Sequence, residues 1–271
     1  MSHPTRILLG HSLRRVRALV GVVALVLATF QILTSLMAAT FEESQAFARI
    51  SSLVPDFVRQ LMGPSLLGML SFGGIVCLGY FHFAIVGWLV GVAIALATEP
   101  AAEIERGFAD LILAHPVPRR AVVARSALVV ILSSAAVLVM MMAGTWVGLM
   151  WLAPPGVTWP PPRLILSLTM NLGALMLCWG GIALAFSAAS RRRAVAASAA
   201  GILALGMFLF DYVARVWKPA KPFAWISPFN YYNPLALVIS QSFPFRHVLV
   251  LVAIGAAGTA IACFVYSRRD I

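Results

Sequence analysis

Charged residues are scarce in this sequence. Asp, Glu, Lys and Arg make up 11% of its 271 residues, against about a quarter in a soluble domain, and so few charges cannot cover a water-soluble surface. The sequence instead contains long apolar runs. Most of them reach the ~20 residues that a helix needs to cross a ~30 Å hydrocarbon layer. We therefore predict an all-α membrane protein with one transmembrane domain over residues 1–271, and spans near 18–40, 66–97, 126–152, 164–189, 194–214 and 247–266.

Other absences exclude several kinds of site. The three cysteines, Cys77, Cys178 and Cys263, each fall inside an expected span without a C-x-x-C pair, so we predict buried thiols, no disulfide framework and no metal site. Lys218 and Lys221 are the only lysines, and neither follows the G-x-x-x-x-G pattern of a nucleotide-binding loop. We predict that the chain is not an enzyme, has no catalytic residues and binds no cofactor of its own.

Basic residues are plentiful, and the formal net charge is +11. They stand in short clusters between apolar runs, as in a membrane protein whose orientation they fix, so we expect no nucleic-acid partner. Six crossings with both termini in the cytoplasm place thirteen of the twenty Lys and Arg residues inside, whereas a hairpin within residues 60–98 would leave nine. We also expect an amphipathic helix over 4–17 lying on the cytoplasmic face, and a short external helix within "SSLVPDFVRQLMGP".

The stretch "TEPAAEIERGFADLILAHPVPRRAVV", residues 98–123, breaks the apolar pattern. Thr98 is suited to capping a helix, Pro100 to its first turn, and the acids to its N-terminal end. Apolar residues at helical spacing form one face, and two prolines end the helix before span 3. We predict a cytoplasmic helix of about a dozen residues that either seals the bundle or docks a soluble partner; its functional residues are Glu99, Glu103, Glu105, Arg106, Gly107, Phe108, Leu111, Ile112, Pro116 and Arg119.

These residues resemble the stretch between spans 2 and 3 of ABC-2 type permeases, which reads as an acid, then E-R-G, an apolar helix and a "P-V-x-R" turn. Here the matching segments are 105–107, 111–113 and 116–119. "SPFNYYNP" at 227–234 is similar to the segment before the last span of that family, and "YSRRDI" to its basic terminus. The acid-rich run that usually follows the glycine is absent, and the segment between spans 1 and 2 matches nothing specific.

The resemblance implies the membrane subunit of an ATP-driven transporter, usually an exporter, in the bacterial cell (inner) membrane. Its implied partners are two copies of a cytoplasmic ATPase subunit, which would bind ATP and Mg, and a second permease copy or paralogue. Phe108, Leu111 and Ile112 would lie in a groove of the ATPase, and Gly107 would let the two backbones approach closely. The scarcity of charge favours a hydrophobic, lipid-linked or drug-like substrate.

Polar residues within the spans are further candidates. His82, with Tyr80 and Gln31, is a possible part of a substrate path, although a hydrogen-bonded packing histidine is the simpler interpretation of His82. Asp211 and Arg215 have the i, i+4 spacing of a helical ion pair. Glycine pairs at 144/148 and 87/91 are suited to close helix packing, within the chain or between chains.

Aromatic residues and prolines alternate over residues 216–245. This composition favours the headgroup region, and the run 235–239 is too short to cross. We predict a re-entrant or interfacial outer segment in which Phe229, Tyr231 and Tyr232 form either an anchor or a gate.

Two other function classes fit less well. An ion-coupled secondary transporter usually carries internal repeats and paired intramembrane carboxylates, and an intramembrane enzyme requires a nucleophile and base or a metal cluster at one depth. The sequence contains no repeat, and neither G-x-S-x-G nor H-E-x-x-H.

Overall fold

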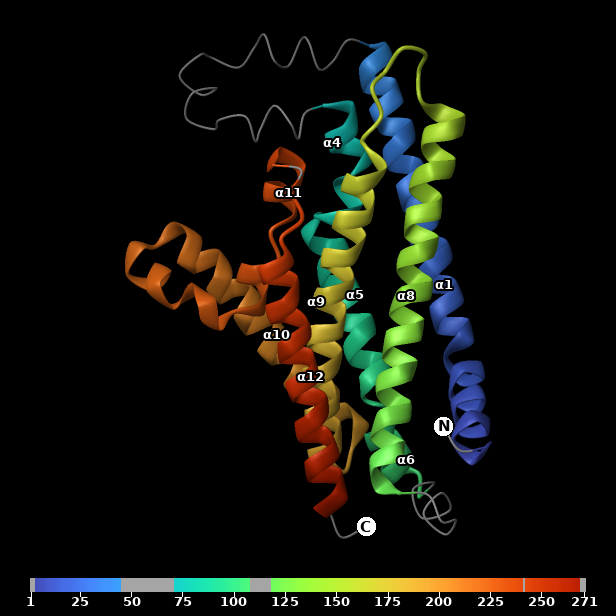
Figure 1. Cartoon of the computed structure of the whole chain (residues 1–271), viewed down its shortest axis with the longest axis vertical. Helices are drawn as coiled ribbons and strands as arrows, with labels where there is room; N and C mark the ends of the chain where they lie inside the picture. The colour runs from blue at the N-terminus through green and yellow to red at the C-terminus, as the bar shows by residue number, and fades with distance from the viewer. Residues whose placement is uncertain (1–2, 45–70, 108–117, 241, 269–271) are drawn as a thin grey trace.

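The protein is an elongated bundle of helices (Figure 1). The computed structural model describes residues 3–44, 71–107, 118–240 and 242–268, and all regular secondary structure in those ranges is helical. Five helices are long and apolar enough to cross a membrane: α1 (His3–Glu43), α8 (Arg119–Leu152), α9 (Pro162–Ala189), α10 (Arg193–Val216) and α12 (Phe245–Arg268). The last four contain the predicted spans 3 to 6.

Helix α9 lies at the centre of the bundle. Two thirds of its most apolar window (67%) is buried inside the protein, against 22% for α10 and for α12. It contacts α5 (Phe83–Ala97), α8, α10 and α12, and Trp179 at its middle is fully buried. The prolines before α9 and Pro162 at its first turn explain where it begins, because proline is favoured at that position.

Glycines set the closest helix contacts. A Cβ on Gly181 of α9 would lie 2.0 Å from the carbonyl oxygen of Gly255 of α12, and one on Gly258 would meet Gly181 at 2.6 Å. On α8, Gly144 lies against the backbone of Ala28 and Gly148 against Ser35 of α1. The predicted close packing at 144/148 is therefore present within the chain. The 87/91 pair differs, because no atom of the described part of the chain lies within 4 Å of a Cβ at either glycine.

The amphipathic helix expected over residues 4–17 is not a separate element. Residues 3–43 form one helix of 41 residues, whose first turns lie at the end of the bundle where α6 is found (Figure 1). This part packs along the bundle: Val16 is buried, and Arg15 pairs with Glu99 of α6 (Glu99–Glu105). The amphipathic helix predicted over 4–17 is therefore the first part of α1.

The second span is broken, which corrects the continuous helix predicted over 66–97. From residue 71 the chain forms α4 (Phe72–Val76), the 3₁₀-helix η1 (Leu78–Tyr80), α5 and α6, and a bend of 41° separates α5 from α6. The Tyr80 carbonyl accepts a hydrogen bond from the Tyr232 hydroxyl, a long-range partner for a carbonyl at the interruption. The α4–α6 segment still runs from one end of the molecule to the other (Figure 1). The predicted external helix lies outside the described residues.

After α10 the chain folds back along itself. The 3₁₀-helices η2 (Lys218–Ile226) and η3 (Pro228–Tyr231) follow, then α11 (Pro234–Ser240). The Ser227 hydroxyl donates to the carbonyl of Met207, 2.9 Å away. Since Met207 precedes the end of α10 by nine residues, this return covers about 14 Å along the helix axis. Phe229 and Tyr232, which follow Ser227 in this returning segment, are buried.

The two termini and α6 lie at the same end of the bundle, called the lower end below (Figure 1). The loop between α8 and α9 lies at the opposite, upper end. This arrangement gives each end a distinct set of loops and positions α6 next to the start of α1.

Candidate functional site

Helix α6 is shorter than predicted. It runs over seven residues, Glu99–Glu105, and is followed by Gly107 at φ +72°. This left-handed conformation is one that glycine adopts without steric cost, and it commonly ends helices. Among the described residues nothing lies within 4 Å of where a Cβ on Gly107 would be, so the local role of this glycine is to end α6. Four predicted contact residues, Phe108, Leu111, Ile112 and Pro116, lie outside the described residues.

The start of α6 also differs from the prediction. Thr98 is the residue before the helix, but its hydroxyl donates to the carbonyl of Ala95 at 3.1 Å and makes no capping bond. Instead, the backbone N–H of Ala101 donates to the Ser187 hydroxyl of α9 at 3.0 Å. This bond satisfies one of the N–H groups left free in a first helical turn and attaches α6 to the central helix.

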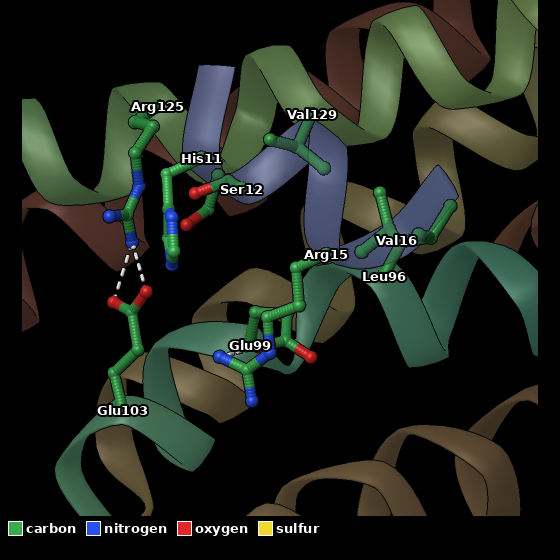
Figure 2. A pocket seen from close by; sticks show the side chains of 10 residues that line it. His11, Ser12, Arg15, Val16, Leu96, Glu99, Glu103, Arg125 and Val129 are labelled. Carbon is green, nitrogen blue, oxygen red and sulfur yellow. Dashed lines mark hydrogen bonds and ion pairs between the residues drawn. The ribbon is translucent and has the colours of Figure 1, made fainter. Parts of the chain in front are cut away.

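Glu103 and Arg125 form a buried ion pair between α6 and α8. One Arg125 nitrogen, Nη2, donates to both carboxylate oxygens, at 2.6 and 2.5 Å. The two side chains are only 10% and 4% exposed, and Figure 2 shows them pointing at each other across the gap between the helices. Burial in a medium of low dielectric makes each charge depend on the other. Glu103 therefore faces the inside of the bundle rather than the surface.

Glu99 bridges two further helices. Its carboxylate lies 3.1 Å from Arg15 of α1 and 3.3 Å from Arg193 at the start of α10. Glu105 accepts from the backbone N–H of Arg193 at 2.9 Å, and the Arg193 guanidinium also donates to the Ala95 carbonyl at 3.0 Å. Arg106 is exposed, and Arg119 is the first residue of α8. Through these acids, α6 is connected to α1, α8 and α10 as well as α9.

A small polar pocket lies between these charges (Figure 2). Its volume is about 20 Å³, enough for a single water molecule. His11 and Ser12 of α1 point into it beside the Glu103–Arg125 pair, and Arg15 and Glu99 form its other side. We refer to Arg15, Glu99, Glu103, Arg125 and Arg193 as the lower ionic cluster.

The predicted substrate-path residues do not form one continuous polar path. Gln31 is fully buried and donates to the Thr145 hydroxyl at 2.8 Å, while the Tyr80 hydroxyl lies 3.0 Å from the same oxygen. This cluster ties α1, α8 and η1 together. His82 lies just before α5 rather than mid-helix and stacks on Phe83 at 4.9 Å. Its buried Nδ1 has no hydrogen-bond partner in the described chain, unlike the hydrogen-bonded histidine we predicted.

The outer residues lie in two environments. Phe229 is buried against Trp179 and Phe208, with ring centroids 5.6 and 5.4 Å away. Tyr231 donates to the Trp225 carbonyl at 3.0 Å and lies more outward, beside His247. The predicted Asp211–Arg215 ion pair is present, at 2.9 Å. Cys77 and Cys178 are buried as predicted, while Cys263 is half-buried.

Sequence reasoning missed all three basic residues of the lower ionic cluster. Arg15, Arg125 and Arg193 were counted only as orientation signals, because their spacing from the acids exceeds any helical repeat. Arg125 nevertheless stands directly before predicted span 3, among apolar residues. An arginine at such a position calls for an acidic partner, and this is the signal that could have identified it.

No known protein family matches this chain, and no curated protein matches it either. The motifs at 105–119 and 227–234, the lower ionic cluster and the helical architecture are therefore the observations from which function is inferred.

Proposed function

We propose that this chain is the membrane-spanning permease subunit of an ATP-driven transporter of the ABC-2 type, and that it acts as an exporter. Five long apolar helices and the broken second span are compatible with a multi-pass membrane protein. The motifs at 105–119 and 227–234 carry the resemblance to that family. We place the protein in a bacterial inner membrane, with the lower end in the cytoplasm.

The lower ionic cluster is the observation that carries the mechanism. Helix α6 has no long apolar face within Glu99–Glu105, and polar bonds connect it to α1, α8, α9 and α10. A force applied to α6 would thus be transmitted to four of the long helices at once. Packed helices move as rigid bodies, so a displacement at this end would tilt helices along the whole bundle.

Energy for such a displacement comes, in this proposal, from ATP and Mg bound on two copies of a separate ATPase subunit. The segment after Gly107, with Phe108, Leu111 and Ile112, supplies the apolar contact with that subunit. A second copy of the permease, or a paralogue, completes the transporter. Gly87 and Gly91 lie on an open groove beside α10 and support close packing of a second chain there.

The experiment is affinity purification of the tagged chain from its native membrane. We expect an ATPase with a nucleotide-binding loop to co-purify with wild type, and its recovery to fall at least tenfold with Phe108→Asp. Phe223→Asp is the matched control, because Phe223 is an exposed aromatic residue of η2, a segment that lies away from the lower end (Figure 1). Equal recovery with both variants, or no ATPase at all, would contradict the proposal.

A further inference from the structure

A second cavity, with aromatic walls, lies near the C-terminal end of α10. Its volume is about 210 Å³, and it opens between α5, α10 and the segment that follows η3. Its lining includes Phe83, Phe208, Asp211, Arg215, Phe229 and Tyr232. Four of these six side chains are aromatic, and two carry opposite charges. The cavity is separate from the lower ionic cluster, and the proposed coupling mechanism does not use it.

The aromatic walls are held in place by contacts with one another and with residues behind them. Phe229 packs edge-on against Phe208 and is backed by Trp179, which is fully buried. Tyr232 is fixed by the hydrogen bond from its hydroxyl to the Tyr80 carbonyl. Rings restrained in this way form a preorganised surface, so that a ligand loses little by ordering them.

The two charges are not equally buried. The Asp211 side chain is 8% exposed, whereas that of Arg215 is 51% exposed. Arg215 donates through Nε to one oxygen of the carboxylate, Oδ2, at 2.9 Å. The other oxygen, Oδ1, is buried and has no hydrogen-bond partner in the described chain. A buried carboxylate oxygen without a partner is costly, and a cation would offset that cost.

We propose that this cavity binds the ammonium group of an amphiphilic organic cation. The negative faces of the aromatic rings attract such a group, as does the carboxylate of Asp211. The apolar part of the ligand would extend along Phe83, which is 68% exposed, toward the lipid. Anionic amphiphiles are disfavoured, because the buried charge is the carboxylate of Asp211, whose Oδ1 has no partner in the described chain.

This inference rests on the proposed function in one respect: it names the class of substrate that the permease would carry. An ammonium group could belong to a free lipophilic cation or to an aminophospholipid headgroup. Both sources share the chemistry that Asp211 and the rings recognise. The lipid composition of the assay can distinguish them.

The test measures binding to the purified chain in lipid nanodiscs, with phenyltrimethylammonium as the probe and calorimetry as the readout. We expect saturable binding to wild type and at least tenfold weaker binding to Asp211→Asn. Glu42→Gln is the matched control, since Glu42 is an exposed acid at the other end of α1 from the lower ionic cluster. Empty nanodiscs correct for partitioning into lipid.

Two further arms make the result specific. The double variant Asp211→Asn/Arg215→Gln keeps the pair neutral, so binding that stays weak identifies the carboxylate as the acceptor. Nanodiscs containing phosphatidylethanolamine should weaken probe binding relative to pure phosphatidylglycerol if the headgroup is the natural ligand, and leave it unchanged if a free cation is. Binding by Asp211→Asn as tight as wild type, or equal displacement by the neutral isostere tert-butylbenzene, would overturn the proposal. Because no ATPase is present, this result is independent of the co-purification test.

Discussion

At the scale of single residues, the Glu103–Arg125 pair is the most sensitive contact at the lower end. Replacing Glu103 by Gln leaves a guanidinium that is only 4% exposed without a counter-charge. We expect a loss of roughly 3 kcal/mol, because removing one partner of a buried pair strands the other charge. Thermal unfolding of the detergent-purified protein would measure it, and Glu105→Gln, at an exposed position, should change stability much less.

The double variant Glu103→Leu/Arg125→Leu separates two explanations of that loss. Without either charge, no ion remains stranded, so the double variant should be more stable than Glu103→Gln. If the double variant is instead less stable than both wild type and Glu103→Gln, the pair stabilises the fold by its own attraction. Stability equal to wild type in Glu103→Gln would show that Arg125 finds another partner.

At the scale of helices, the crossing of α9 and α12 depends on glycine. An added methyl group at residue 181 would lie 2.0 Å from the Gly255 carbonyl oxygen, which is backbone and cannot move aside locally. We expect Gly181→Ala to destabilise the protein by about 1–3 kcal/mol. Gly201→Ala on α10 is the matched control, because no described residue lies within 4 Å of its added carbon, and it should be neutral or slightly stabilising. The same thermal unfolding assay compares the two variants. Equal stability of Gly181→Ala and Gly201→Ala would contradict the close crossing of α9 and α12.

Long apolar helices were predictable from the sequence, and their interruptions were not. The bounds of α9 and α12 agree with the predicted spans within two residues at each end, because hydropathy and flanking prolines act locally. The break before α5 depends on contacts across the chain. Tyr232 bonds to Tyr80, and a Cβ on Gly79 would lie 2.0 Å from the Gln31 side chain. No pattern within span 2 encodes those distant partners.

The candidate sites show the same division between local and long-range information. The Asp211–Arg215 pair was predictable because both residues lie one turn apart on one helix. Each ion pair of the lower ionic cluster joins two residues that are 22 or more positions apart, and together the pairs connect α1, α6, α8 and α10. Only the packing of those helices reveals that Glu103 faces Arg125. The seven-residue length of α6 was also missed, because the glycine at its end was interpreted as a contact point.

At the scale of the whole molecule, charge and architecture lead to one orientation. Both termini and α6 lie at the lower end, and the basic clusters near them account for thirteen of the twenty Lys and Arg residues. Because basic loops remain in the cytoplasm, we expect the lower end to face inward. Arg106 and Thr158 are exposed residues near opposite ends, so cysteines introduced there should react on opposite sides of the membrane.

The measurement uses a membrane-impermeant maleimide on intact cells, in a background with Cys77, Cys178 and Cys263 replaced by Ala. Thr158→Cys should be labelled from outside, and Arg106→Cys only after the cells are opened. Labelling of Arg106→Cys in intact cells would place α6 outside, where no cytoplasmic ATPase could reach it. That single outcome would contradict both the orientation inferred from charge and the proposal that α6 transmits force from an ATPase.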